Sequence, residues 1–87
     1  MKAIVWSKYN CPYCDQAKAL LKQKGIVFEE VRVDQDQEAR EFIINAGHRT
    51  VPQIYHNGKV FVEGGYQGLA RLDDSAFQQL KENINVT

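Results

Sequence analysis

Apolar residues follow two different spacings along this chain, and the two spacings alternate from its N-terminal end onward. Residues 2–7 form a short apolar run with β-branched side chains, which is typical of a buried strand. From Asp15 to Lys24 the apolar residues recur at helical spacing, lysines occupy polar positions, and Gly25 follows as a stop signal. The sequence therefore predicts a strand followed directly by an amphipathic helix.

The succession of strand and helix recurs over residues 27–47. The segment Val27–Val33 is rich in β-branched residues and favours a second strand. Asp34 is a residue type that caps helices, so we expect it to open the second helix, which ends at Gly47. The apolar face of that helix consists of residues spaced three and four apart, namely Ala39, Phe42, Ile43 and Ala46.

The remaining residues predict a hairpin and a helical end. Two short runs, Val51–Tyr55 and Lys59–Glu63, flank the dipeptide Asn57-Gly58, which is a strong signal for a tight hairpin turn. A helical region follows the glycine pair at 64–65, with apolar positions at Leu69, Leu72, Phe77, Leu80 and Ile84. The polar run at 73–75 is able to cap this region or to interrupt it, so one helix and two helices both stay open.

The predicted elements follow in the order β-α-β-α-β-β-α, which describes an α/β fold with a four-stranded mixed sheet flanked by helices. The first two strands are joined through a helix and are expected to be parallel, whereas the last two form an antiparallel hairpin. The 87 residues suit one domain spanning 1–87 with a single hydrophobic core.

Composition and charge narrow the range of partners. Hydrophobic residues make up 44% of the chain and charged residues 25%, as in ordinary globular proteins. Eleven basic and eleven acidic residues cancel, so we expect no nucleic-acid or membrane partner, since both favour basic patches. The apolar run at 2–7 is too short for a signal peptide or a bilayer span. We expect a cytoplasmic protein, in which two cysteines indicate catalysis or metal binding rather than a structural disulfide.

The two cysteines stand in the segment Cys11-Pro12-Tyr13-Cys14, between the first predicted strand and the first helix. Pro12 suits the first helical turn because its missing N–H has no intrahelical partner to lose. Cys11 then falls at or near the helix N-cap, where unpaired N–H groups and the helix dipole favour the thiolate, and Lys8 adds positive charge. Cys14 lies one turn further and is able to close a disulfide with Cys11. The segment indicates a redox site.

Metal binding is the alternative chemistry for two cysteines. Zinc sites use about four ligands, and the only histidines, His48 and His56, do not stand at a familiar ligand spacing. We therefore expect no metal site and two histidines that face solvent. Trp6 and Phe61 lie in predicted strands, so we expect them in the core or on a face of the sheet.

Three motifs together resemble the glutaredoxin family along nearly the whole chain: Cys11-Pro12-Tyr13-Cys14, Thr50-Val51-Pro52 and Gly64-Gly65-Tyr66. The resemblance implies the thioredoxin fold and a glutathione-dependent disulfide oxidoreductase with no tightly bound cofactor. The thiolate of Cys11 would attack a protein disulfide or a glutathione mixed disulfide, and Cys14 would resolve the resulting intermediate. Some glutaredoxins bind an iron–sulfur cluster with glutathione as a ligand, but the Pro12-Tyr13 pair argues against that role here.

The resemblance also implies where glutathione binds as co-substrate. In glutaredoxins the proline matching Pro52 is cis and lies beside the active-site disulfide. The backbone of the residue matching Val51 pairs with the peptide-like part of the substrate. The glycine pair lets the backbone approach the ligand, and the residues after it bind the γ-glutamyl end. The matching positions are Lys8, Tyr13, Thr50, Val51, Pro52, Gly65, Tyr66 and Gln67.

Two positions depart from the family pattern. Gly68 stands where many members have an aspartate, and Ala39 replaces a glutamine that often meets the glycine carboxylate of glutathione. Arg40 or Arg49 is a candidate to bind that carboxylate instead, because a guanidinium suits a carboxylate. The departures leave open a second electron donor, thioredoxin reductase, which reduces redoxins of similar fold.

The resemblance extends to protein partners. Relatives donate electrons to ribonucleotide reductase, so the clients implied for this chain are disulfide-containing proteins, and ribonucleotide reductase is a candidate among them. We expect the chain to act as a monomer.

Overall fold

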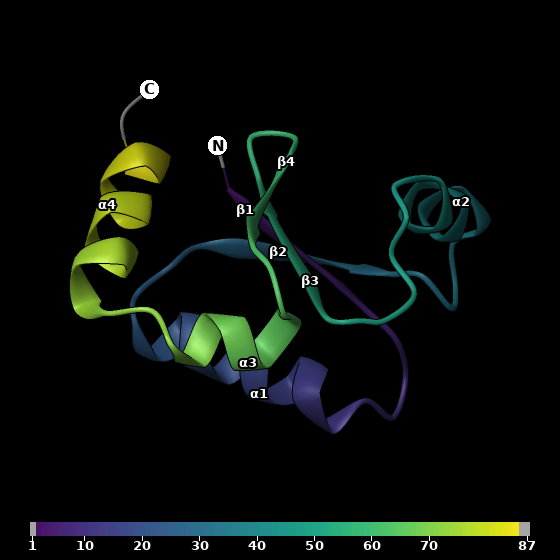
Figure 1. Cartoon of the computed structure of the whole chain (residues 1–87), viewed down its shortest axis with the longest axis horizontal. Coiled ribbons are helices and arrows are strands. Elements are labelled where there is room, and N and C mark those ends of the chain that lie inside the picture. The colour runs from purple at the N-terminus through teal and green to yellow at the C-terminus, as the bar shows by residue number, and fades with distance from the viewer. Residues whose placement is uncertain (1, 86–87) are drawn as a thin grey trace.

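A computed structural model describes residues 2–85 of the chain. A four-stranded sheet with the strand order β2-β1-β3-β4 forms its centre, and helices cover it (Figure 1). The elements in chain order are β1 (Ala3–Ser7), α1 (Pro12–Gln23), β2 (Phe28–Arg32), α2 (Gln37–Asn45), β3 (Gln53–His56), β4 (Lys59–Val62), α3 (Gly65–Ala70) and α4 (Asp74–Asn85).

The strand pairing is the mixed pairing that the sequence predicted. β1 lies parallel to β2, with Ala3 opposite Phe28, and antiparallel to β3, with Trp6 opposite Gln53. β3 and β4 form the antiparallel hairpin. At its tip Asn57 and Gly58 have φ angles of 58° and 80°, the left-handed conformation that a tight hairpin turn requires.

The main hydrophobic core lies between one face of the sheet and the helices α1, α3 and α4. Its fully buried members come from strands and helices alike, and each contributes roughly 1.5–3 kcal/mol through burial of its side chain. The largest are Val5, Leu21, Ile54, Leu69 and Leu80. Figure 1 shows α1 and α3 side by side below the sheet, with α2 set apart from them.

The opposite face of the sheet is covered by α2 through an aromatic cluster. Because successive residues of a strand point to opposite faces, Trp6 turns away from the core that its neighbour Val5 enters. The Trp6 ring stacks on Phe42 of α2 at 4.8 Å between centroids, and Tyr55 packs against both rings. The prediction that Trp6 lies on a face of the sheet is confirmed, and Phe61 is likewise half-buried.

The prediction that both histidines face solvent is wrong. His48 is half-buried, and its Nε2 lies 2.7 Å from the hydroxyl of Tyr55, which extends the aromatic cluster. His56 is also half-buried, and its Nε2 is buried with no hydrogen-bond partner among the described residues. His48 lies in the loop after α2 and His56 is the last residue of β3. Both positions adjoin the sheet, so a place in a loop or hairpin does not imply exposure here.

A second correction concerns the start of α2. Asp36, and not Asp34, caps this helix, because Asp36 Oδ1 accepts from the N–H groups of Glu38 and Ala39 at 3.0 and 3.3 Å. Asp34 instead receives two hydrogen bonds from the Arg32 guanidinium. A carboxylate two residues nearer the helix therefore takes the capping position.

The C-terminal region consists of two helices, which decides the alternative that the sequence left open. α3 ends at Ala70 and α4 begins at Asp74. Asp73 stands between them, and its Oδ1 accepts from the Ala76 N–H at 3.0 Å and from the Ser75 hydroxyl at 2.9 Å. These bonds satisfy the first turn of α4 and separate it from α3. Among residues 2–85, no helix is both long and apolar enough to cross a membrane.

A polar cluster joins the end of β1 and the middle of β2 to α1. The hydroxyl of Ser7, which is fully buried, donates to Glu30 Oε2 at 2.5 Å, and Lys18 Nζ donates to the same oxygen at 2.8 Å. These two donors, Lys18 first and Ser7 second, hold the pKa of Glu30 below its usual 4.5.

The Glu30 carboxylate gives the stability of the fold a predictable pH dependence. A carboxyl group whose pKa is lowered by folding stabilises the fold above its unfolded-state pKa, and this contribution is lost as the pH falls through the folded-state pKa. We expect Glu30→Gln to lower the free energy of unfolding at neutral pH by up to about 1 kcal/mol, since the pair is partly solvated. We also expect a flatter pH profile below about pH 4.5. Urea unfolding over a pH series measures both effects.

Glu29→Gln provides the control, because Glu29 is an exposed carboxylate on the same strand with no ion pair among the residues described. An equal loss of stability in both variants would contradict a specific role for the Ser7–Glu30–Lys18 cluster.

Candidate active site

The two cysteines lie where β1 passes into α1. Cys11 is the N-cap of α1, with extended backbone angles, and its Sγ accepts from the Cys14 N–H at 3.2 Å. Pro12 occupies the start of the helix, as expected. Cys11 and Cys14 form a disulfide with their Cα atoms 5.2 Å apart. Cys11 is 7% exposed and Cys14 only 1%, so Cys11 is the more accessible of the two residues.

The loop from β1 to Cys11 is fixed by Asp34. Asp34 Oδ2 accepts from the Tyr9 N–H at 3.0 Å, and Arg32 binds both oxygens of the same carboxylate. These contacts, the Arg32 hydrogen bond first, lower the pKa of Asp34 to about 2, so the carboxylate is charged at ordinary pH. Sequence reasoning missed this role, because the contact joins residues 25 positions apart.

The segment 50–53 faces Cys11 from the start of β3. The Val51–Pro52 peptide bond is cis, as the resemblance implied. The carbonyl oxygen of Val51 lies 3.8 Å from Cys11 Sγ. The side chain of Gln53, which is 8% exposed, donates from Nε2 to the Thr50 carbonyl at 2.8 Å. No sequence motif singled out Gln53.

A cleft of about 370 Å³ opens on one side of this segment. Tyr13 and Tyr66 both line it, and their rings stack with the centroids 6.1 Å apart. Gly65 has a φ of 58°, and a Cβ there would lie 2.9 Å from the Pro52 carbonyl oxygen, so glycine permits the close approach of α3 to this segment. The lining residues are Tyr13, Thr50, Val51, Pro52, Gln53, Gly64, Gly65, Tyr66 and Gln67.

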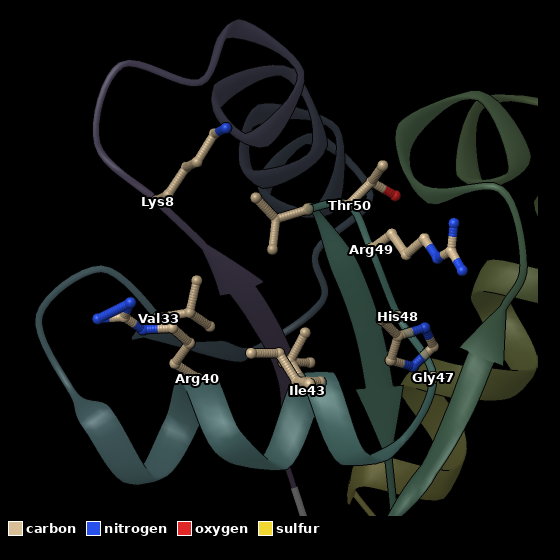
Figure 2. A pocket seen from close by; sticks show the side chains of 10 residues that line it. Lys8, Val33, Arg40, Ile43, Gly47, His48, Arg49 and Thr50 are labelled. Carbon is tan, nitrogen blue, oxygen red and sulfur yellow. The ribbon is translucent and has the colours of Figure 1, made fainter.

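A second cleft, of about 560 Å³, opens on the other side of Thr50 and Val51. Its floor is apolar and its margin is basic, with the residues Lys8, Val33, Arg40, Ile43, Ile44, Gly47, His48, Arg49, Thr50 and Val51 lining it. Figure 2 shows Arg40 beside Val33 and Arg49 extending to the opposite side, past Thr50. Within residues 2–85, none of the cations Lys8, Arg40 and Arg49 takes part in an ion pair.

The structure therefore places the predicted glutathione-binding residues in two clefts that share Thr50 and Val51, and the Val51 carbonyl lies beside Cys11 Sγ. Tyr13, Gly65, Tyr66 and Gln67 belong to the first cleft, whereas the three cations belong to the second. Within the described part of the chain, no group of three or more His, Cys, Asp or Glu residues is arranged to hold a metal ion.

The two departures from the family pattern have structural reasons. A Cβ on Gly68 would overlap the Glu63 carbonyl, so the backbone at this position excludes a side chain. Ala39 is 6% exposed and lies on the buried side of α2, where a small apolar residue packs. Its neighbour Arg40 is exposed and lines the second cleft, which gives that cleft a cation.

Comparisons with known proteins agree with this geometry. A family model described as Glutaredoxin matches residues 3–61. The chain is 41% identical over 70 residues to Glutaredoxin 3 of Escherichia coli K12, a match that covers 79% of this chain and 82% of that protein. Two solved structures extend the similarity to the whole fold.

The first of these is the solution structure of a glutaredoxin from Brucella melitensis, which is 31% identical with a TM-score of 0.75 and covers 100% of this chain and 95% of its own. The second is the crystal structure of a buckwheat glutaredoxin–glutathione complex, which is 26% identical with a TM-score of 0.74 and covers 93% of this chain and 76% of its own. The sheet with its flanking helices is the thioredoxin fold expected from the sequence.

Proposed function

This chain belongs to the glutaredoxin family and is a thiol–disulfide oxidoreductase, and from this premise we propose that glutathione is its reductant. The observation that carries the proposal is the pair of clefts that meet at Thr50 and Val51 beside Cys11. A tripeptide with its sulfur at Cys11 would extend one end into each cleft. The similar buckwheat protein, whose structure is that of a glutaredoxin–glutathione complex, supports the same reading.

The two clefts offer hydrogen-bond donors for one end of glutathione and cations for the other. The γ-glutamyl end would lie against Gly65, Tyr66 and Gln67, where the first N–H groups of a helix have no intrahelical partner and are free to donate. The glycine carboxylate would bind one of the cations that line the second cleft, Lys8, Arg40 or Arg49, because a guanidinium or ammonium binds a carboxylate through charge-assisted hydrogen bonds.

Reduction of the client proceeds by two thiol–disulfide exchanges, and two more restore the dithiol. The thiolate of Cys11 attacks a client disulfide, forms a mixed disulfide and releases one client thiolate. The thiolate of Cys14 then attacks Cys11 Sγ, which closes the Cys11–Cys14 disulfide and releases the second client thiolate. Two glutathione molecules restore the dithiol and leave as glutathione disulfide. The N–H of Cys14, which donates to Cys11 Sγ, stabilises the thiolate at Cys11.

The clients and compartment belong to the same proposal. A dithiol donor of this type suits disulfide-containing proteins of the cytosol, and ribonucleotide reductase is one candidate among them. The basic margin of the second cleft favours client segments or glutathione adducts that carry negative charge. We propose that the chain acts on them as a monomer.

The electron donor is tested by following NADPH oxidation with a small disulfide substrate. One reaction contains glutathione with glutathione reductase, and the other contains thioredoxin reductase alone. We expect turnover with glutathione only, because the clefts beside Cys11 suit a charged tripeptide. Turnover with thioredoxin reductase only would contradict the proposal and assign the chain to the other redoxins, in agreement with the missing side chain at Gly68.

Substitution of each cysteine tests the division of roles. We expect Cys11→Ser to abolish reduction of both a protein disulfide and a glutathione mixed disulfide, because Cys11 is the accessible sulfur. Cys14→Ser is expected to lose protein-disulfide reduction and to retain part of the deglutathionylation, since glutathione itself resolves the Cys11 adduct. Steady-state rates on the two substrates measure this asymmetry. Equal losses in both variants on both substrates would show that the roles are not divided in this way.

Single substitutions of Lys8, Arg40 and Arg49 by glutamine identify the carboxylate-binding cation. We expect the KM for a glutathionylated peptide to rise about three- to tenfold when that cation is lost. For Arg40 or Arg49 we expect kcat to stay unchanged, since these side chains would bind substrate and take no part in the exchange. Loss of Lys8 would also lower kcat, because its charge favours the Cys11 thiolate. Arg71→Gln is the matched control, because Arg71 is an exposed arginine outside both clefts. Three variants with the KM of the parent, or an Arg71 variant with the same rise, would contradict the assignment.

A further inference from the structure

The peptide unit between Thr50 and Val51 has its two ends in different surroundings. Its carbonyl accepts the hydrogen bond from Gln53 Nε2 at 2.8 Å. The N–H of Val51 belongs to the same peptide unit and makes no hydrogen bond among the described residues. Val51 lines both clefts and its own carbonyl lies beside Cys11 Sγ. An unpaired backbone donor therefore stands at the point where the two clefts meet.

Planarity of the peptide bond couples these two groups. In a trans peptide the C=O and N–H lie in one plane and point in opposite directions. A side chain that fixes the Thr50 carbonyl therefore also fixes the direction of the Val51 N–H. Gln53 is well placed to fix the Thr50 carbonyl, because the residue is only 8% exposed and lies in β3 opposite Trp6. The Thr50 carbonyl points toward the buried side-chain amide of Gln53, so the Val51 N–H points away from that side chain.

We propose that Gln53 is a positioning residue that aims the Val51 N–H at the peptide group of glutathione when the glutathione sulfur is joined to Cys11. This inference rests on the proposed function and adds to it a residue that need not touch the substrate's reacting atoms. Without the Gln53 donor, the Thr50–Val51 peptide plane is free to rotate. Recognition of glutathione then weakens, whereas the exchange chemistry at Cys11 continues.

The experiment measures a preference between two thiols in a Cys14→Ser background. The protein is equilibrated with glutathione and its disulfide, or with 2-mercaptoethanol and its disulfide, and the fraction of Cys11 in each mixed disulfide is determined by mass spectrometry. 2-Mercaptoethanol has no peptide group, so it has nothing to accept from the Val51 N–H. The ratio of the two equilibrium constants therefore reports recognition of glutathione and cancels the reactivity of Cys11.

Gln53→Met removes the donor and keeps a similar side-chain volume. We expect it to lower the preference for glutathione about three- to tenfold, the range for the loss of one aligned hydrogen bond. The equilibrium constant for the mixed disulfide with 2-mercaptoethanol is expected to equal that of the parent protein. Gln78→Met is the control, because it removes an amide that donates to Glu82 on α4, outside both clefts. This control is expected to retain the preference of the parent.

Gln53→Glu gives a second test that does not depend on the methionine variant folding. At about pH 7.5 an ionised glutamate only accepts hydrogen bonds and repels the Thr50 carbonyl, whereas at about pH 5 a buried glutamate gains the proton that it needs to donate. We expect a reduced preference at the higher pH that recovers at the lower pH. A merely structural role for the side chain predicts no such recovery.

The outcomes separate this inference from the proposed function. A parent protein that shows no preference for glutathione would overturn the proposed function, and the inference with it. A parent that prefers glutathione, together with Gln53→Met and Gln53→Glu variants of unchanged preference, would overturn the inference alone. A loss confined to the Gln53 variants, with recovery of the glutamate variant in acid, is the result expected.

Discussion

The hydrogen bond from the Cys14 N–H to Cys11 Sγ is the contact on which the site depends. A helix N-terminus has N–H groups without intrahelical partners, and most helices use an oxygen-bearing side chain to satisfy one of them. α1 uses a sulfur instead, and Pro12 removes a further donor that would need a partner. The same geometry that begins the helix therefore favours negative charge on Cys11 Sγ, the sulfur that we propose as the nucleophile. The cap of the helix and the proposed activation of the thiol are one physical arrangement in this chain.

The sheet brings the second half of the site to that sulfur. β1 and β3 are antiparallel, and Trp6 near the end of β1 lies opposite Gln53 at the start of β3. The loop that leaves β1 toward Cys11 and the segment that enters β3 through Pro52 consequently meet at one edge of the sheet. Cys11 and Val51 are 40 positions apart in sequence, yet their contact follows from the register of two short strands. A shift of this register would remove Val51 from Cys11 while leaving the helix cap intact.

Features set by neighbouring residues and the order of the strands were predictable from the sequence, whereas individual side-chain contacts between distant residues were not. The cap at Cys11 and the hairpin turn at Asn57-Gly58 are set within four residues, and both were predicted. Asp34 and Asp36 are equally suited to cap a helix, and the choice between them is made by tertiary contacts of Asp34. The hydroxyl that contacts His48 Nε2 likewise belongs to another element, because Tyr55 lies in β3. Pattern alone carries no information about such partners.

The distribution of charge along the chain, rather than its sum, distinguishes the second cleft. The chain has no net charge, yet three cations stand without ion pairs at the margin of one cleft. The ion pairs of the described residues are Lys18–Asp15, Lys18–Glu30, Lys24–Asp74 and Arg32–Asp34. These pairs neutralise their own surroundings, and salt screens a charge beyond about 8 Å. Lys8, Arg40 and Arg49 carry no such partner among residues 2–85, so a chain with no net charge still has three unpaired cations along one cleft.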